Sequence, residues 1–209
     1  MKERIHRAYR ISKYVVYRQT IVEPLDHLWT FIGAFIGIGT IGYLQSRQFA
    51  QLDTVYLIGS FGASAVLVFG ATNSPLAQPR NLFFGHLVSA LIGVSVAKLV
   101  PDTLWLSAAL AVSLAIVAMQ ITRTMHPPGG ATALIATIGG PDIKALGYGY
   151  VLSPVMSGVF ILLVVAVVVN NIPRTRNYPY RKVGHPLRRL HRRKLMQRMP
   201  GLARLLARL

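Results

Sequence analysis

The chain alternates between long apolar stretches and short polar connections. Apolar residues dominate six segments, at residues 28–44, 55–70, 82–100, 104–121, 131–138 and 150–169. A helix needs about 20 mainly apolar residues to cross a bilayer, and most of these segments approach that length. The pattern therefore predicts an all-α polytopic membrane protein with about six transmembrane helices. The fifth segment is short, so we expect a short or broken helix after His126.

Basic residues are concentrated at the two ends of the chain. Of 23 Lys and Arg, six lie in residues 1–20 and twelve in residues 174–209, which leaves five for the 153 residues between them. Basic segments beside membrane helices tend to stay in the cytoplasm. We therefore predict an even number of crossings. The expected parts are a basic cytoplasmic segment at 1–22, a transmembrane domain at 23–172 and a basic amphipathic cytoplasmic tail at 173–209.

Two points about this topology stay open. Four crossings with two re-entrant segments would also keep both ends inside, but they would put Arg80 and Arg123 outside, which fits the charge rule less well. The tail mixes Leu and Met with Arg at roughly helical spacing. We expect it to lie on anionic lipid headgroups rather than on nucleic acid.

Small residues recur in the predicted helices and include a weak internal repeat. GASAVL at 62–67 resembles GATALI at 130–135. With six crossings these copies lie in the second and fifth helices, which run in opposite directions. That placement favours an inverted three-helix repeat, although six small and aliphatic residues also match by chance. Small residues let membrane helices approach closely. We expect such packing at four glycines of the first segment, Gly33, Gly37, Gly39 and Gly42.

Residue types that are missing exclude several classes of protein. The chain has no cysteine, and therefore no disulfide, thiol nucleophile or thiolate metal site. None of its six acidic residues lies within an apolar segment, which argues against a cation carrier and against paired-carboxylate catalysis. We expect no enzymatic activity, no cofactor and no metal. The N-terminal segment lacks the apolar core of a secretory signal, and a cell inner membrane is the expected location.

Two polar segments interrupt the apolar pattern, at residues 71–86 and 123–132. Each contains one Arg, one His and two Pro, together with hydroxyl or amide side chains. Proline breaks helices. Broken backbone at membrane depth is tolerated only where it is buried in protein or lines a water-filled cavity. Both segments are therefore candidate parts of a transport pathway.

The second polar segment has features of an anion site. After its two prolines the chain can restart as a helix, whose first N–H groups have no partner within the helix. Gly129 and Gly130 leave that backbone accessible, and Thr132 adds a hydroxyl. A tight turn between two helices explains the same residues equally simply.

The arginines and histidines of these segments allow two interpretations each. The planar guanidinium groups of Arg80 and Arg123 suit flat oxyanions, but one basic residue per cytoplasmic loop would also account for them. His86 and His126 could carry a proton, or could fix the backbone by bonding a carbonyl. The predicted proton-coupling residues are these two histidines. The predicted substrate-binding residues are Ser64, Asn73, Ser74, Gln78, Arg80, Asn81, Arg123, His126, Gly129, Gly130 and Thr132.

Motifs in both polar segments resemble the HPP family of integral membrane proteins, which is named for a His-Pro-Pro motif. That motif is present at 126–128, within HPPGGATAL at 126–134. Further matches are FGASAVLVF at 61–69, SPLAQPRN at 74–81, Gly-His at 85–86 and Asn-Asn at 170–171. Together they cover about residues 24–180. The resemblance implies four membrane spans, whereas the apolar pattern predicts six. It also implies a link to nitrite transport, which is associated with plastid and cyanobacterial members.

The sequence thus favours a membrane transporter or channel for a small inorganic anion, with nitrite or nitrate suggested by the resemblance alone. The alternative is a membrane scaffold or sensor that does not transport, whose basic tail binds lipid or a partner protein. Whether the chain forms a homo-oligomer is left open.

Overall fold

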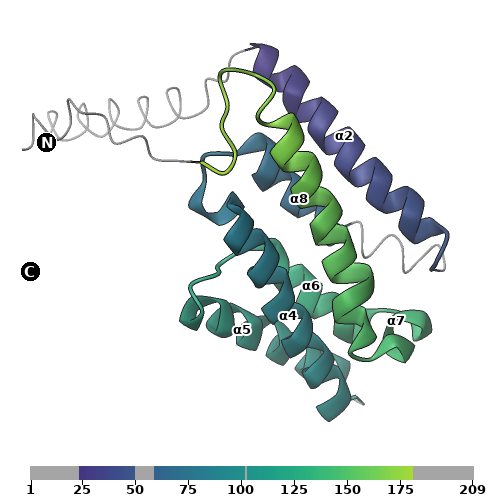
Figure 1. Ribbon diagram of the computed structural model, residues 1–209. Helices are drawn as coiled ribbons and strands as arrows, with labels where there is room; N and C mark the ends of the chain where they lie inside the picture. Colours follow the sequence, from purple (N-terminus) through teal and green to yellow (C-terminus); the bar gives the residue numbers. More distant parts are fainter. Residues whose placement is uncertain (1–23, 50–58, 102, 181–209) are drawn as a thin grey trace, which may run out of the picture.

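The computed structural model describes residues 24–49, 59–101 and 103–180, and these fold into helices joined by short turns (Figure 1). The predicted N-terminal segment at 1–22 and the predicted tail beyond residue 180 lie outside the described residues. The helices are α2 (Pro24–Ser46), the helix Gly59–Gly70, α4 (Pro79–Leu99), α5 (Leu104–Ile121), α6 (Pro128–Ile138), α7 (Pro141–Leu146) and α8 (Ser157–Val169). A π-helical segment (Val151–Met156) leads into α8, another ends the 59–70 helix (Val66–Gly70), and a short 3₁₀ turn (Pro75–Ala77) precedes α4.

Four of these helices are long and apolar enough to cross a membrane: Pro24–Ser46, Pro79–Leu99, Leu104–Ile121 and Val151–Val169. Two shorter apolar helices, Gly59–Gly70 and Pro128–Ile138, lie between them in the chain. The predicted all-α membrane architecture is confirmed, and each of the six predicted segments coincides with a helix. The short helix that the pattern predicts after His126 is present as Pro128–Ile138. The 59–70 helix is described from residue 59 onward.

The helices alternate in direction between two ends of the bundle. Arg176, which follows α8, forms a salt bridge with Asp26 in the first turn of α2, so the first and last described segments lie at the same end. The Arg80 side chain at the start of α4 donates to the carbonyl of Thr122, which follows α5. The start of α4 and the end of α5 therefore lie together, at the same end of the bundle. We call this the terminal end. The other, where α2 and α4 finish and α7 lies, is the distal end (Figure 1).

Glycines allow α4 and α6 to pack in close contact near the centre of the bundle. A Cβ atom on Gly93 of α4 would lie 2.5 Å from the backbone oxygen of Ala133 in α6, which is too close for any side chain. Gly129 of α6 likewise faces α4, at the Ser89 hydroxyl. In α2, Gly33 and Gly37 pack on the Phe69 ring as predicted, whereas Gly39 faces open space.

Two helix contacts are of the kind that the predicted inverted repeat requires. Helix α2 packs on α8, and α5 packs on α4 (Figure 1). A two-fold axis between the two halves would place α2 on α5, the 59–70 helix on α6, and α4 on α8. It would therefore exchange the α2–α8 pair with the α5–α4 pair. The repeat copies at 62–67 and 130–135 fall in the two short helices. These run in opposite directions, because the 59–70 helix finishes at the terminal end and α6 begins there.

Residues 173–180 pack back onto the bundle, although the sequence assigns them to a basic tail. The Arg176 side chain is buried, and besides Asp26 it donates to the Phe69 carbonyl at 3.1 Å and the Thr30 hydroxyl at 2.8 Å. The buried Tyr178 hydroxyl donates to the Ala77 carbonyl at 2.7 Å. The folded bundle therefore includes residues 173–180, the last ones that the structure describes. A count of basic residues does not distinguish a buried arginine from one at the membrane surface.

Candidate functional site

A cluster of buried polar side chains lies where the two short helices meet α4. Its members are Ser60 and Ser64 of the 59–70 helix, His86 of α4, His126 before α6, and Thr132 of α6. Each side chain is at most 3% exposed. The two imidazole rings lie 4.9 Å apart between centroids. We refer to these five residues as the histidine cluster.

The position of each member follows from local sequence. Ser60 and Ser64 are one helical turn apart and therefore face the same side of their helix. His86 follows Gly85, and a Cβ there would lie 2.6 Å from the Cβ of His126. This glycine lets the turn that carries His126 lie directly against α4. The prolines after His126 end that turn and start α6, which points Thr132 back into the cluster.

Hydrogen bonds join the five side chains into one chain. The Ser64 Oγ lies 2.8 Å from His86 Nε2 and 3.0 Å from His126 Nε2. The Thr132 Oγ1 lies 2.7 Å from His86 Nδ1 and 2.6 Å from the Ser60 Oγ. His126 Nδ1 lies 2.9 Å from the backbone oxygen of Leu76. Every ring nitrogen of both histidines therefore has a partner.

The Leu76 carbonyl fixes the direction of these bonds when both rings are neutral. A carbonyl only accepts, so His126 Nδ1 carries the proton and its Nε2 accepts from Ser64. Since Ser64 has one proton to give, it accepts from His86 Nε2–H. His86 Nδ1 then accepts from Thr132, which accepts in turn from Ser60. Each side chain thus donates to the next, from Ser60 through Thr132, His86, Ser64 and His126 to the Leu76 carbonyl.

The cluster also has a bonding arrangement for one additional proton. If His126 Nε2 is protonated, it donates to the Ser64 Oγ, and the Ser64 hydroxyl can turn to the Ser60 backbone oxygen at 3.3 Å. Both arrangements satisfy every donor. They differ by one proton and by rotation of one hydroxyl group. The hydrogen bonds of the cluster therefore have room for one additional proton without leaving an unsatisfied polar group.

Four predicted site residues meet in this cluster, namely Ser64, His86, His126 and Thr132. The others of the first polar segment lie at the terminal end, where they bond the backbone of the turns. The Gln78 amide donates to the Thr72 and Ser74 carbonyls and accepts from Tyr180 N–H. The Asn81 amide donates to the Met125 carbonyl at 2.7 Å. The Ser74 hydroxyl accepts from Leu76 N–H, and Asn73 is exposed.

The two predicted arginines are exposed at the terminal end. Arg80 donates to the Thr122 carbonyl at 3.2 Å, which leaves other donors of its guanidinium directed to the surroundings. Arg123 follows α5 with a φ of 56°, a left-handed conformation typical of the residue that terminates a helix. They flank the turns around His126 but do not contact the histidine cluster.

The two predicted glycines have different surroundings. Gly129 packs against Ser89 and Gly85 of α4. Gly130 faces an apolar groove between α5 and α6, which is lined by Val112, Ile116, Met119, Met125, Pro127, Ala131 and Leu134. Their N–H groups donate to the carbonyls of His126 at 2.8 Å and Pro127 at 3.0 Å. The first N–H groups of α6 thus have partners within the turn.

Three further polar residues belong to this region and are not among the predicted site residues. Ser60 lies one turn before Ser64, so helical spacing could have suggested it. The Tyr150 hydroxyl donates to the Thr132 carbonyl at 2.9 Å, a contact that no local pattern encodes. The Ser89 hydroxyl is fully buried beside Gly129 and has no hydrogen-bond partner among the residues that the structure describes.

The chain has clear relatives. Residues 19–179 match the family described as "HPP, transmembrane region". Two proteins of Dictyostelium discoideum, each named as a transmembrane protein, are 47% and 45% identical over 154 residues. This alignment covers 72% of the chain but 49% and 54% of those relatives, so the chain spans about half of their length. No solved structure matches the chain. The family match and the apolar helices agree, and the chain is a multi-pass membrane protein of the HPP family.

Proposed function

We propose that this protein transports a small inorganic anion, with nitrite or nitrate as the first candidates. The observation that carries the proposal is the histidine cluster, a buried chain of hydroxyl and imidazole groups between the two short helices. A bilayer-spanning protein needs no such polar centre for packing. Polar and titratable groups inside a membrane protein are costly, and they commonly mark the path of a substrate or proton.

The charges of the described helices support an anion rather than a cation. Asp26 and Asp142 are the acidic residues among the described residues, and neither lies near the cluster. Asp26 is in the first turn of α2 and pairs with Arg176, and Asp142 is exposed in α7 at the distal end. The hydroxyl groups of Ser60, Ser64 and Thr132 supply hydrogen-bond donors for an anion, and no carboxylate lies among them. The unpaired Ser89 hydroxyl beside Gly129 adds one more donor.

The two bonding arrangements of the cluster support coupling to a proton. An isolated charge is expensive to bury. An anion that enters together with a proton brings no net charge into the bundle. His126 can receive that proton because Ser64 turns to the Ser60 carbonyl. Proton-coupled entry of the anion is therefore the mode of transport that we propose.

The distribution of basic residues supports an orientation. Arg80, Arg123, Arg174 and Arg176 all lie at the terminal end. Both strongly basic ends of the sequence connect to this end. By the positive-inside rule the terminal end then faces the cytoplasm, and Arg80 and Arg123 flank the cytoplasmic mouth. We propose the cell inner membrane as the location, with both chain ends cytoplasmic.

Uptake of nitrite and nitrate into proteoliposomes tests the proposal. We expect uptake above that of protein-free liposomes, which also control for direct permeation of nitrous acid. Uptake should rise when the external solution is made weakly acidic. Replacing nitrite by a small cation should give no uptake. If correctly folded protein gives no anion uptake under any of these conditions, the alternative of a membrane scaffold or sensor would replace transport.

A further inference from the structure

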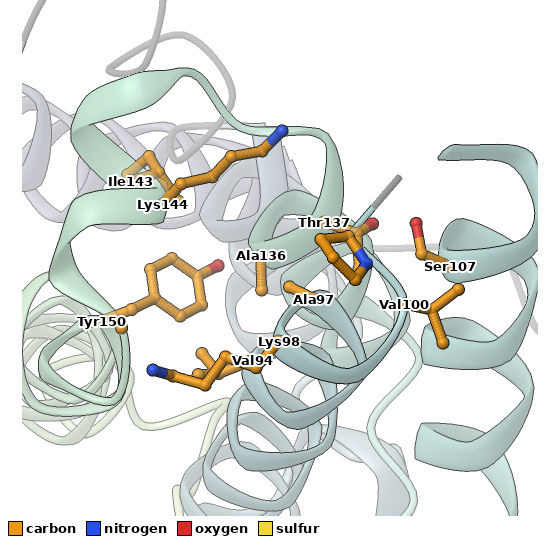
Figure 2. Close-up of a pocket in the computed structure, with 12 residues that line it drawn as sticks. Val94, Ala97, Lys98, Val100, Ser107, Ala136, Thr137, Ile143, Lys144 and Tyr150 are labelled. Atoms are coloured by element: carbon orange, nitrogen blue, oxygen red, sulfur yellow. The ribbon is translucent and has the colours of Figure 1, made fainter. Parts of the chain in front are cut away.

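A cavity at the distal end has no role in the function described so far. Its volume is about 220 Å³. It lies between the end of α4, the start of α5, the end of α6 and the segment around α7 (Figure 2). The polar side chains that line it belong to Lys98, Ser107, Thr137, Lys144 and Tyr150. The volume is large enough for a nitrite or nitrate ion with several water molecules, each of which occupies about 30 Å³ in the liquid.

Two lysines give this cavity a positive charge. Lys98 and Lys144 both line it, and none of its described lining residues is acidic. The Lys98 ammonium lies 5.5 Å from the centre of the Tyr148 ring, and the Tyr148 hydroxyl is bonded to Ser95 at 3.0 Å. These contacts hold the ammonium beside the cavity. In Figure 2 the two lysines lie above and below Tyr150. A cleft lined by charges of one sign concentrates ions of the opposite sign.

Tyr150 lies between this cavity and the backbone of Thr132, a member of the histidine cluster. Tyr150 lines the cavity and is 1% exposed. Its hydroxyl donates to the backbone carbonyl of Thr132, whose own hydroxyl is bonded to His86. Ala136, one turn after Thr132 in α6, lines the cavity as well. The cavity therefore borders the cluster on the side away from the terminal end.

We propose that this cavity is the distal entry site for a small inorganic oxyanion, with Tyr150 as the side chain that lies between it and Thr132 of the histidine cluster. The inference rests on the proposed function, which it extends by assigning the entry route. Lys98 and Lys144 attract the anion, and Tyr150 must rotate away from Thr132 to let it pass. The cavity gives the anion access from the side opposite Arg80 and Arg123.

Lysines at a membrane interface also extend toward lipid headgroups, and that role requires no cavity. A test must therefore measure the ionic environment inside the cavity. The absence of cysteine makes this direct, because one introduced cysteine is then the sole thiol in the chain. Ala97, a small lining residue of α4, is the first position, and Ser107, of nearly the shape of cysteine, is the second.

The experiment measures the modification rates of Ala97→Cys and Ser107→Cys by an anionic and a cationic methanethiosulfonate, each normalised to a free thiol in solution. We expect the anionic reagent to be favoured at both positions. The combined Lys98→Gln and Lys144→Gln substitutions should reduce that preference at least roughly fivefold. The control is Arg47→Gln, which removes a distal cation that does not line the cavity and should leave the preference unchanged.

Nitrite should also slow modification at Ala97→Cys more than the larger anion gluconate does at equal ionic strength. Equal effects of the two anions, or a preference that the lysine substitutions do not change, would overturn the proposal. The labelling requires no flux. A nitrite-protected cavity in a protein without uptake would therefore contradict transport alone. Uptake without anionic preference would contradict the entry site alone.

Discussion

Ser64 is the side chain that contacts both imidazole rings of the histidine cluster. Its replacement leaves His86 Nε2 without an acceptor and His126 Nε2 without a donor in a fully buried place. A buried polar group that loses its partner costs about 1–3 kcal/mol. We expect Ser64→Ala to lower the free energy of unfolding in detergent micelles by about this amount. Ser113→Ala, which removes an exposed hydroxyl bonded within its own helix, should change it little. Equal stability of the two variants would show that the chain of hydrogen bonds is not formed.

Arg176 illustrates what a residue's type does not reveal. The sequence contains 23 Lys and Arg, and this one differs from its neighbours only by its partners in space. Residue types suggested His86, His126 and Thr132 as candidates, because polar side chains beside prolines are unusual within apolar segments. Which atoms bond to which depends on contacts across α4, α6 and the 59–70 helix. Tyr150 was missed for that reason.

The salt bridge of Arg176 provides a second test at this scale. Arg176→Gln removes the charge that pairs with Asp26 and leaves the backbone oxygens of Phe69 and Asp26 without their donor. Breaking a buried ion pair by removing one partner costs about 3–5 kcal/mol. We expect thermal unfolding of Arg176→Gln in detergent at a clearly lower temperature than wild type. The same change at the exposed Arg174 should leave the midpoint nearly unchanged. Similar midpoints for both variants would mean that residues 173–180 do not pack on the bundle.

At the level of the elements, helix positions follow from the sequence more readily than helix contacts do. Each apolar segment forms a helix because its backbone groups can be satisfied within the bilayer only in that way. The prolines at the starts of α4, α6 and α7 mark the boundaries well, since proline is favoured in the first turn. The glycines were less informative. Gly33 and Gly93 face neighbouring elements, whereas Gly39 faces none, and composition does not separate them.

Close packing of α4 on α6 predicts opposite effects for two glycine substitutions. Gly93→Ala places a methyl group against the Ala133 backbone and should destabilise the protein by about 1–3 kcal/mol. Gly39→Ala adds the same methyl group in open space and should be neutral or stabilising by up to about 1 kcal/mol. Unfolding of both variants in detergent micelles measures the difference. Equal tolerance would mean that the two helices are further apart than described.

For the whole molecule, the alternation of helix directions predicts which connections share a side of the membrane. Gln48 follows α2 at the distal end, and Asn73 follows the 59–70 helix at the terminal end. Single cysteines at these positions should react from opposite sides with a membrane-impermeant thiol reagent, Gln48→Cys from outside and Asn73→Cys from the cytoplasm. Labelling of both from one side would restore the arrangement with re-entrant segments. Charge predicts an even number of crossings, and the first and last described segments lie at the same end of the bundle. The close packing of the 59–70 helix and α6 could not be predicted, because it depends on contacts between the two halves of the chain.

The central claim is that the histidine cluster lies on the path of the anion. Thr132→Val tests it most directly, because valine keeps the shape of threonine and removes only the hydroxyl that joins His86 to Ser60. The measurement is nitrite uptake into proteoliposomes per amount of folded protein, with Thr40→Val on the exposed face of α2 as the matched control. We predict that Thr132→Val lowers uptake at least about tenfold, which corresponds to roughly 1.4 kcal/mol in the barrier, and that Thr40→Val leaves it unchanged. Wild-type uptake in well-folded Thr132→Val protein would contradict the account.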